Sequence, residues 1–308
     1  MFRSILIASF VVMAVVHSLI AQEFVPLYPD GKMPNSKGMS LKEEIREERI
    51  YQVGTPGIHV FLPKTKENTG VAVLVIPGGG YLRIAHIGAR TSVANWFNSL
   101  GIAVFALDYR LPTSPDLIQK ELGPLQDAQR AIRVIRQNAD RWKIDREKIG
   151  VMGSSAGGHA ASFVATTSGD AAKIGDESDR VSARPSFMIL AAPVITMGAL
   201  AHTGSKRYLL GENPSKEMVD KYSTERLVTE KTPPAFIFLA SDDRSVNPKN
   251  GILFYSALVD NGVSATLHIF PTGGHSIPLK NGPGSSAEWT KLCELWLREI
   301  KMLPETKK

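Results

Sequence analysis

A serine lies at the centre of five small residues, Gly153-Ser154-Ser155-Ala156-Gly157, which match the pattern G-x-S-x-G. The apolar run KIGVM precedes them and the small-residue run AGGHAASFVA begins within them, so the sequence predicts a strand, a sharp turn and a helix. A serine in such a turn is lifted clear of the sheet, and the helix amino end behind it favours a developing negative charge. We interpret Ser155 as a candidate nucleophile, with a plain Gly/Ser turn as the alternative.

Three consecutive glycines follow another apolar run, in VLVIPGGGY (73–81), well upstream of that serine. Glycine lets the main chain approach a substrate carbonyl closely, so we expect N–H groups here to bind an oxyanion. Gly79 and Gly80 are the candidate donors, together with the N–H of Ala156. A flexible turn is the alternative. A phosphate-binding loop is disfavoured, because no Lys-Ser/Thr follows the glycines.

A serine nucleophile of this type needs an acid and then a base further along the chain. His275 lies in the glycine-rich loop FPTGGHSIP, after the last apolar run, and is the candidate general base. Asp242 and Asp243 follow the preceding run, AFIFLA; the pattern D-x-x-V-x-P favours Asp243 as the acid and leaves Asp242 to cap the turn. Structural or surface roles are predicted for His17, His59, His159 and His268.

The elements that must position these residues follow from the hydrophobic pattern. Short apolar runs rich in β-branched residues are typical of buried parallel strands, and they occur at 71–77, 102–109, 148–153, 187–195, 235–240 and 265–270. Helical segments separate them, at 91–101, 125–137 and 249–262 among others. This alternation predicts an α/β fold with a mostly parallel central sheet and helices on both faces. Two edge strands are expected, at 48–53 and 57–63.

The remaining segments define the domain organisation. Residues 1–21 have a positive start, an apolar stretch and a small residue at a cleavage position, which predicts a signal peptide and a secreted or periplasmic bacterial protein; an uncleaved anchor is the alternative. Residues 22–47 are expected to be an irregular lead, and 48–303 a single catalytic domain. The polar stretch 196–234 is expected to be an insertion after the sixth strand that forms a lid or one wall of a pocket.

Composition excludes several classes of function. The chain has 308 residues, 43% of them hydrophobic and 21% charged, with a formal net charge of +6 from scattered Lys and Arg, so it does not fit a nucleic-acid-binding protein. No stable membrane insertion is expected after signal cleavage. The only cysteine, Cys293, rules out an intrachain disulfide and is expected to be a packed core thiol on the apolar side of a C-terminal helix.

The motifs together resemble an esterase family within the α/β-hydrolases, the bacterial acetyl xylan esterase-like or feruloyl-esterase-like group. The resemblance covers about residues 60–300 and rests on VIPGGGY (75–81), LDYRLP (107–112), PLQDAQRAIRVIR (124–136), IDREKIGVMGSSAGGHAAS (144–162), HTGSKRYLLG (202–211), ASDDRSVNP (240–248) and GGHSIP (273–278). One departure is Pro77, which stands where the lipase HGGG motif has His.

The resemblance implies a serine esterase that uses a Ser-His-Asp triad and an acyl-enzyme intermediate to deacetylate acetylated sugars such as xylan, with no metal or organic cofactor. Its partner is then a small-molecule or oligosaccharide ester. Tyr81, His86 and Arg110 are then candidates to line or brace the pocket. A structural role is the alternative for each of them, above all for Arg110, whose alternative is a pairing with Asp127 or another carboxylate. A general short-chain carboxylesterase, a prolyl-oligopeptidase-like peptidase and a non-catalytic binding protein on the same fold remain alternatives.

Overall fold

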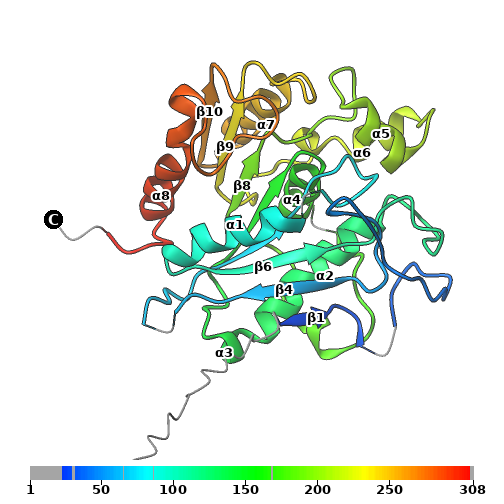
Figure 1. Cartoon of the computed structure of the whole chain (residues 1–308). Coiled ribbons are helices and arrows are strands. Elements are labelled where there is room, and N and C mark those ends of the chain that lie inside the picture. The colour runs from blue at the N-terminus through cyan, green and yellow to red at the C-terminus, as the bar shows by residue number, and fades with distance from the viewer. Residues whose placement is uncertain (1–22, 30–31, 65, 86, 168, 306–308) are drawn as a thin grey trace, which may run out of the picture.

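The computed structural model describes residues 23–305 apart from 30, 31, 65, 86 and 168. A sheet of eight strands forms the centre of the molecule (Figure 1). In spatial order the strands are β1 (Phe24–Pro26), β4 (Gly57–Phe61), β6 (Ala103–Asp108), β5 (Ala72–Ile76), β7 (Ile149–Ser154), β8 (Met188–Ala191), β9 (Ala235–Ala240) and β10 (Ala265–Phe270). The pairs β1–β4 and β4–β6 are antiparallel, and every other pair in this sheet is parallel. The mostly parallel sheet predicted from the sequence is confirmed.

Helices cover both faces of the sheet, so the central strands are buried on both faces. Alternate residues of β5 enter different cores: Leu74 packs on the side of α2 (Gly123–Gln137), α4 (Ala156–Thr166) and α7 (Lys249–Asp260), and Val73 on the side of α1 (Ile87–Ser99) and α8 (Trp289–Glu299). Cys293 of α8 is fully buried in the second core, as expected for a packed thiol. Within the described residues, no helix is long and apolar enough to cross a membrane.

Two predictions about the amino-terminal part are wrong. The lead 22–47 is not wholly irregular, since it contains β1 and the short strand β2 (Glu44–Arg46). The predicted strand at 48–53 forms β3 (Arg49–Gln52), which pairs with β2 in a separate two-stranded sheet, and β4 lies one strand inside the edge because β1 covers it. Strands of three residues are too short to produce a periodic signal. The predicted signal peptide, 1–21, lies outside the described residues.

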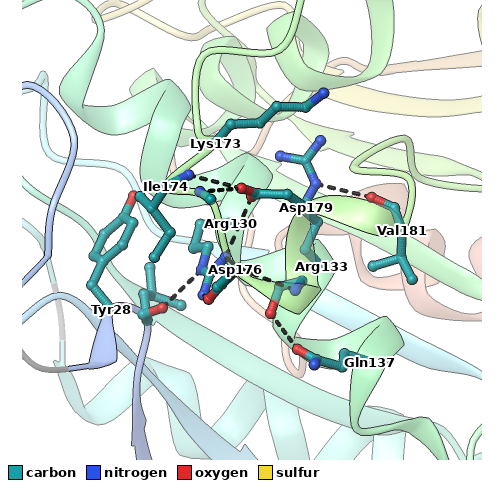
Figure 2. Close-up of polar contacts among 12 residues, drawn as sticks. Tyr28, Arg130, Arg133, Gln137, Lys173, Ile174, Asp176, Asp179 and Val181 are labelled. Carbon is teal, nitrogen blue, oxygen red and sulfur yellow. Dashed lines mark hydrogen bonds and ion pairs between the residues drawn. The ribbon is translucent and has the colours of Figure 1, made fainter.

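The polar face of α2 is buried under the segment 167–186, which connects α4 to β8. Arg130, only 2% exposed, donates to Asp176 at 2.7 Å, and Arg133 donates to the carbonyl oxygen of Val181 at 2.9 Å (Figure 2). Charge-assisted bonds of this kind replace apolar packing on this side of the helix. The amphipathic pattern of α2 therefore reflects two buried interfaces, one apolar against the sheet and one polar against a connecting segment.

The expected insertion, 196–234, lies between β8 and β9. It contains two short helices, α5 (Thr203–Leu210) and α6 (Lys216–Lys221), which sit together at one end of the sheet (Figure 1). His202 caps the amino end of α5 by accepting a hydrogen bond from the backbone N–H of Ser205. This segment therefore has a defined local structure, and its position brings α5 close to the carboxyl ends of the parallel strands.

Candidate active site

Ser155 occupies the sharp turn between β7 and α4. Its backbone has φ 54° and ψ −124°, a conformation that residues with a side chain rarely adopt. The turn is tight because α4 starts directly against the neighbouring strand: a Cβ added to Gly157 would lie 2.2 Å from the carbonyl oxygen of Ile76. The small residues of the G-x-S-x-G pattern are thus required by the approach of the helix to β5.

His275 and Asp243 meet Ser155 from two separate loops. The Nε2 atom of His275 lies 2.8 Å from the Ser155 Oγ atom, and its Nδ1 atom lies 2.7 Å from Oδ2 of Asp243. These loops follow β10 and β9, so their residues gather at the carboxyl edge of the sheet, where β7 also ends. Asp242 points elsewhere, and its Oδ1 atom accepts a hydrogen bond from the Gly274 N–H at 2.8 Å.

The electrostatics of Asp243 fix the orientation of His275. The Asp243 side chain is only 2% exposed. Burial raises its pKa, but hydrogen bonds from His275 and from the N–H groups of Val246 and Ser245 outweigh burial, and the net pKa is lowered. The ionised carboxylate accepts a hydrogen bond from Nδ1–H of the imidazole, which leaves Nε2 as the acceptor for the Ser155 hydroxyl.

The glycine loop presents free main-chain donors beside this serine. Gly79 has φ +131°, and a Cβ there would lie 1.9 Å from the carbonyl oxygen of Arg83, so only glycine fits. Its own carbonyl accepts hydrogen bonds from the N–H groups of Leu82 and Arg83. Across the part of the chain that the structure describes, the N–H groups of Gly79, Gly80 and Ala156 have no hydrogen-bond acceptor.

Tyr81 braces that loop from behind and is fully buried. Its hydroxyl donates to Nδ1 of His159 at 2.7 Å, and Nε2 of His159 donates to the carbonyl oxygen of Tyr222 at 2.7 Å. Burial lowers the pKa of His159 to about 4, which keeps the imidazole neutral with one donor and one acceptor. A structural or surface role was predicted for this histidine, and its burial makes the role structural. The sequence carries no local signal for partners 78 and 63 residues away.

Arg110 pairs with Asp127 and not with the residues around Ser155. Arg110 is 3% exposed and donates to Asp127 through its side chain, with 2.8 Å between Nη2 and Oδ1, so the structural alternative predicted for it is confirmed. The same carboxylate also accepts from the Arg110 backbone N–H at 2.7 Å. His86 lies outside the described residues.

A cleft of about 1090 Å³ opens over Ser155 and His275. The insertion forms one of its walls through His202, Gly204 and Tyr208 on and beside α5, which agrees with one of the two roles expected for that segment. Another part of the lining is apolar and comes from α1 and from the segment after His275, with Val93, Trp96, Ile277 and Leu279.

Comparisons with known proteins agree with this geometry. The family model BD-FAE matches residues 58–258. The chain is 38% identical to an acetyl ester-xyloside bifunctional hydrolase from Caldicellulosiruptor lactoaceticus of known structure, with a TM-score of 0.76 over 92% of this chain and 97% of that one. It is 36% identical to an acetylxylan esterase from Xylanibacter ruminicola over 70% of its length, and 32% identical to endo-1,4-beta-xylanase B from Butyrivibrio fibrisolvens over 81%. The chain spans 42% and 40% of these two relatives.

Proposed function

This chain belongs to the BD-FAE family of α/β-hydrolase esterases, and from that premise we propose that it is a serine carboxylic-ester hydrolase that deacetylates acetylated sugars such as those of xylan. One observation carries the proposal: the hydrogen-bonded series Ser155–His275–Asp243, at 2.8 Å and 2.7 Å, at the floor of an open cleft. A nucleophile, a base and an orienting acid in this order are what acyl transfer requires.

In the acylation step, the Ser155 Oγ atom attacks the ester carbonyl carbon while Nε2 of His275 takes the hydroxyl proton. Asp243 stabilises the imidazolium that forms, because its pKa is lowered and it stays ionised. The N–H groups of Gly79, Gly80 and Ala156 bind the tetrahedral oxyanion. The imidazolium then gives its proton to the sugar oxygen, the C–O bond breaks and the alcohol leaves.

In the deacylation step, water replaces the sugar beside His275. Nε2 takes a proton from that water as its oxygen attacks the acyl carbon, and the same amides bind the second oxyanion. Collapse of this intermediate returns the proton on His275 to Ser155 and releases acetic acid, which ionises in water to acetate. His275 therefore carries the proton that is transferred in each of the two steps, and the reaction needs no reactant other than water.

The proposed substrate class rests on the relatives, since one is named as an acetylxylan esterase and another as an acetyl ester-xyloside hydrolase. The apolar part of the cleft lining, with Val93 and Trp96, favours a second candidate, a short-chain carboxylesterase without sugar preference. Export through residues 1–21, which fits a polymeric substrate outside the cell, is a separate proposal that amino-terminal sequencing of the mature protein would test.

The test compares acetylated xylo-oligosaccharides with 4-nitrophenyl acetate, and the wild type with Ser155→Ala. We expect acetate release from both substrates, labelling of the wild type by a fluorophosphonate probe, and loss of both in the variant. Activity on 4-nitrophenyl acetate alone would favour the general esterase. Near wild-type turnover in Ser155→Ala would refute the mechanism.

A further inference from the structure

The imidazole of His202 is held in one tautomer at the wall of the cleft. Its Nδ1 atom accepts the backbone N–H of Ser205 at 3.1 Å and lies 2.8 Å from the Ser205 hydroxyl, and Ser205 is itself fully buried. Because Nδ1 is an acceptor in this helix cap, the ring proton is on Nε2. His202 therefore presents an N–H donor whose direction is fixed by the start of α5.

This donor has no partner within the residues that the structure describes, and its ring lines the cleft. The ring lies against the glycine loop: a Cβ added to Gly80 would be 3.7 Å from Cε1 of His202, and one added to Gly204 would be 3.2 Å from the same atom. Burial lowers the pKa of His202, the nearby His275 lowers it further and Asp243 raises it, with a net lowering. This favours the neutral imidazole, in which the one ring proton is on Nε2.

We propose that Nε2–H of His202 donates a hydrogen bond to a free hydroxyl of the sugar, on the carbon next to the one that carries the scissile acetyl group. This rests on the proposed function. The leaving oxygen must lie beside His275, and His275 and His202 line the same cleft and are close enough for His275 to lower the pKa of His202, so a hydroxyl on the adjacent carbon lies within the part of the cleft that both rings line. Tyr208 lies one helical turn after Gly204 and lines the same wall, where its ring offers an apolar surface to the sugar.

An additional oxyanion donor is the competing role for His202, and two arguments favour the sugar hydroxyl. Three main-chain N–H groups without an acceptor among the described residues, those of Gly79, Gly80 and Ala156, are already available to an oxyanion. His202 also belongs to the insertion that forms one wall of the cleft, and not to the turn or the glycine loop that surrounds Ser155. The proposal makes His202 a specificity-determining residue.

The test uses His202→Asn. Asparagine is a good helix cap and its Oδ1 atom replaces Nδ1 as the acceptor for the Ser205 N–H, but it lacks a donor at the position of Nε2. We expect kcat/KM for a monoacetylated xyloside with a free neighbouring hydroxyl, divided by kcat/KM for 4-nitrophenyl acetate, to fall about tenfold, as for one lost hydrogen bond to a substrate hydroxyl. The thermal midpoint should stay within about 2 °C of the wild type if the cap is retained.

A deoxy xyloside acetate, without the neighbouring hydroxyl, completes a double-mutant cycle between enzyme and substrate. For the wild type, the ratio of kcat/KM on the xyloside to kcat/KM on 4-nitrophenyl acetate should fall about tenfold when the neighbouring hydroxyl is removed from the substrate. For His202→Asn, removal of the same hydroxyl should change the ratio little, because the hydrogen bond is already lost. Equal losses on sugar and nitrophenyl esters, or independent losses in the cycle, would overturn the proposal. If the wild type is labelled at Ser155 and hydrolyses 4-nitrophenyl acetate but no acetylated xyloside, the proposed substrate class fails and this proposal fails with it. Active hydrolysis of xyloside acetates with no change of ratio in His202→Asn overturns the role of His202 alone.

Discussion

The turn at Ser155 holds a residue with a side chain in a strained backbone conformation, and this strain lowers the stability of the folded protein by an amount that can be measured. At φ 54° and ψ −124°, a residue with a Cβ carries a penalty of about 1–3 kcal/mol that glycine avoids. Glycine in turn gains conformational freedom in the unfolded chain, which lowers stability by about 0.4–1 kcal/mol. Ser155→Gly and Ser155→Ala both lose the hydroxyl and its bond to His275, so their comparison isolates these two effects. We expect Ser155→Gly to be about 1 kcal/mol more stable than Ser155→Ala.

Urea unfolding of the two variants measures this difference directly. The midpoint should be higher for Ser155→Gly at an unchanged slope, and the thermal midpoint should rise by about 2–4 °C. A fluorophosphonate probe should label neither variant, which makes them matched in chemistry and different only in backbone freedom. Equal stabilities would limit the strain at this turn to about 0.4–1 kcal/mol, the amount that the freedom of glycine offsets. An alanine variant that is more stable by about 0.4–1 kcal/mol would show that the turn stores no strain.

Three further predictions follow from the geometry of the site. The pKa of His159 is about 4 in the folded protein and ordinarily 6.5, so between these pH values only the unfolded chain gains a proton on this ring. The free energy of unfolding should therefore drop by about 3 kcal/mol as the pH falls through this range. Urea titrations at pH 7, 5.5 and 4.5 should show this drop for the wild type and not for His159→Gln. Asp243→Asn should lower kcat on 4-nitrophenyl acetate by about 10⁴-fold, because Asp243 orients His275. Asp242→Asn should lower kcat less than about tenfold, because Asp242 accepts a hydrogen bond from the Gly274 N–H and not from His275. Gly79→Ala should lower the free energy of unfolding by about 2 kcal/mol or more, measured in urea, since its Cβ would collide with the Arg83 carbonyl oxygen.

The parallel sheet and the loops at its carboxyl edge were predictable because their signals are local. Central strands are apolar along their whole length, and parallel connections carry every strand end to the same edge. Ser155, Asp243 and His275 each follow such a strand, and the structure brings the three together. The choice of Asp243 over Asp242 also had a local basis, since its Oδ1 atom accepts the N–H groups of Ser245 and Val246, both within the motif.

Features that depend on distant partners could not be predicted in the same way. Tyr81 and Tyr222 both bond to His159, yet neither lies near it in the sequence. The polar face of α2 has the residue pattern of a solvent-exposed helix face. Nothing in the sequence of α2 indicates that the segment 167–186 covers this face. At these positions the local sequence predicts which type of side chain is present, but the residue that it contacts is determined by the tertiary structure.

The neutral imidazole of His159 has a consequence for recombination between relatives. It joins the glycine loop, through Tyr81, to the backbone of the insertion, through Tyr222. A chimera that takes 196–234 from a relative to acquire a new sugar preference therefore also replaces the carbonyl group that anchors this ring. Unless the donor segment places a carbonyl at the same point, the exchange alters the loop that binds the oxyanion. Specificity and transition-state binding are physically linked in this scaffold and must be inherited together.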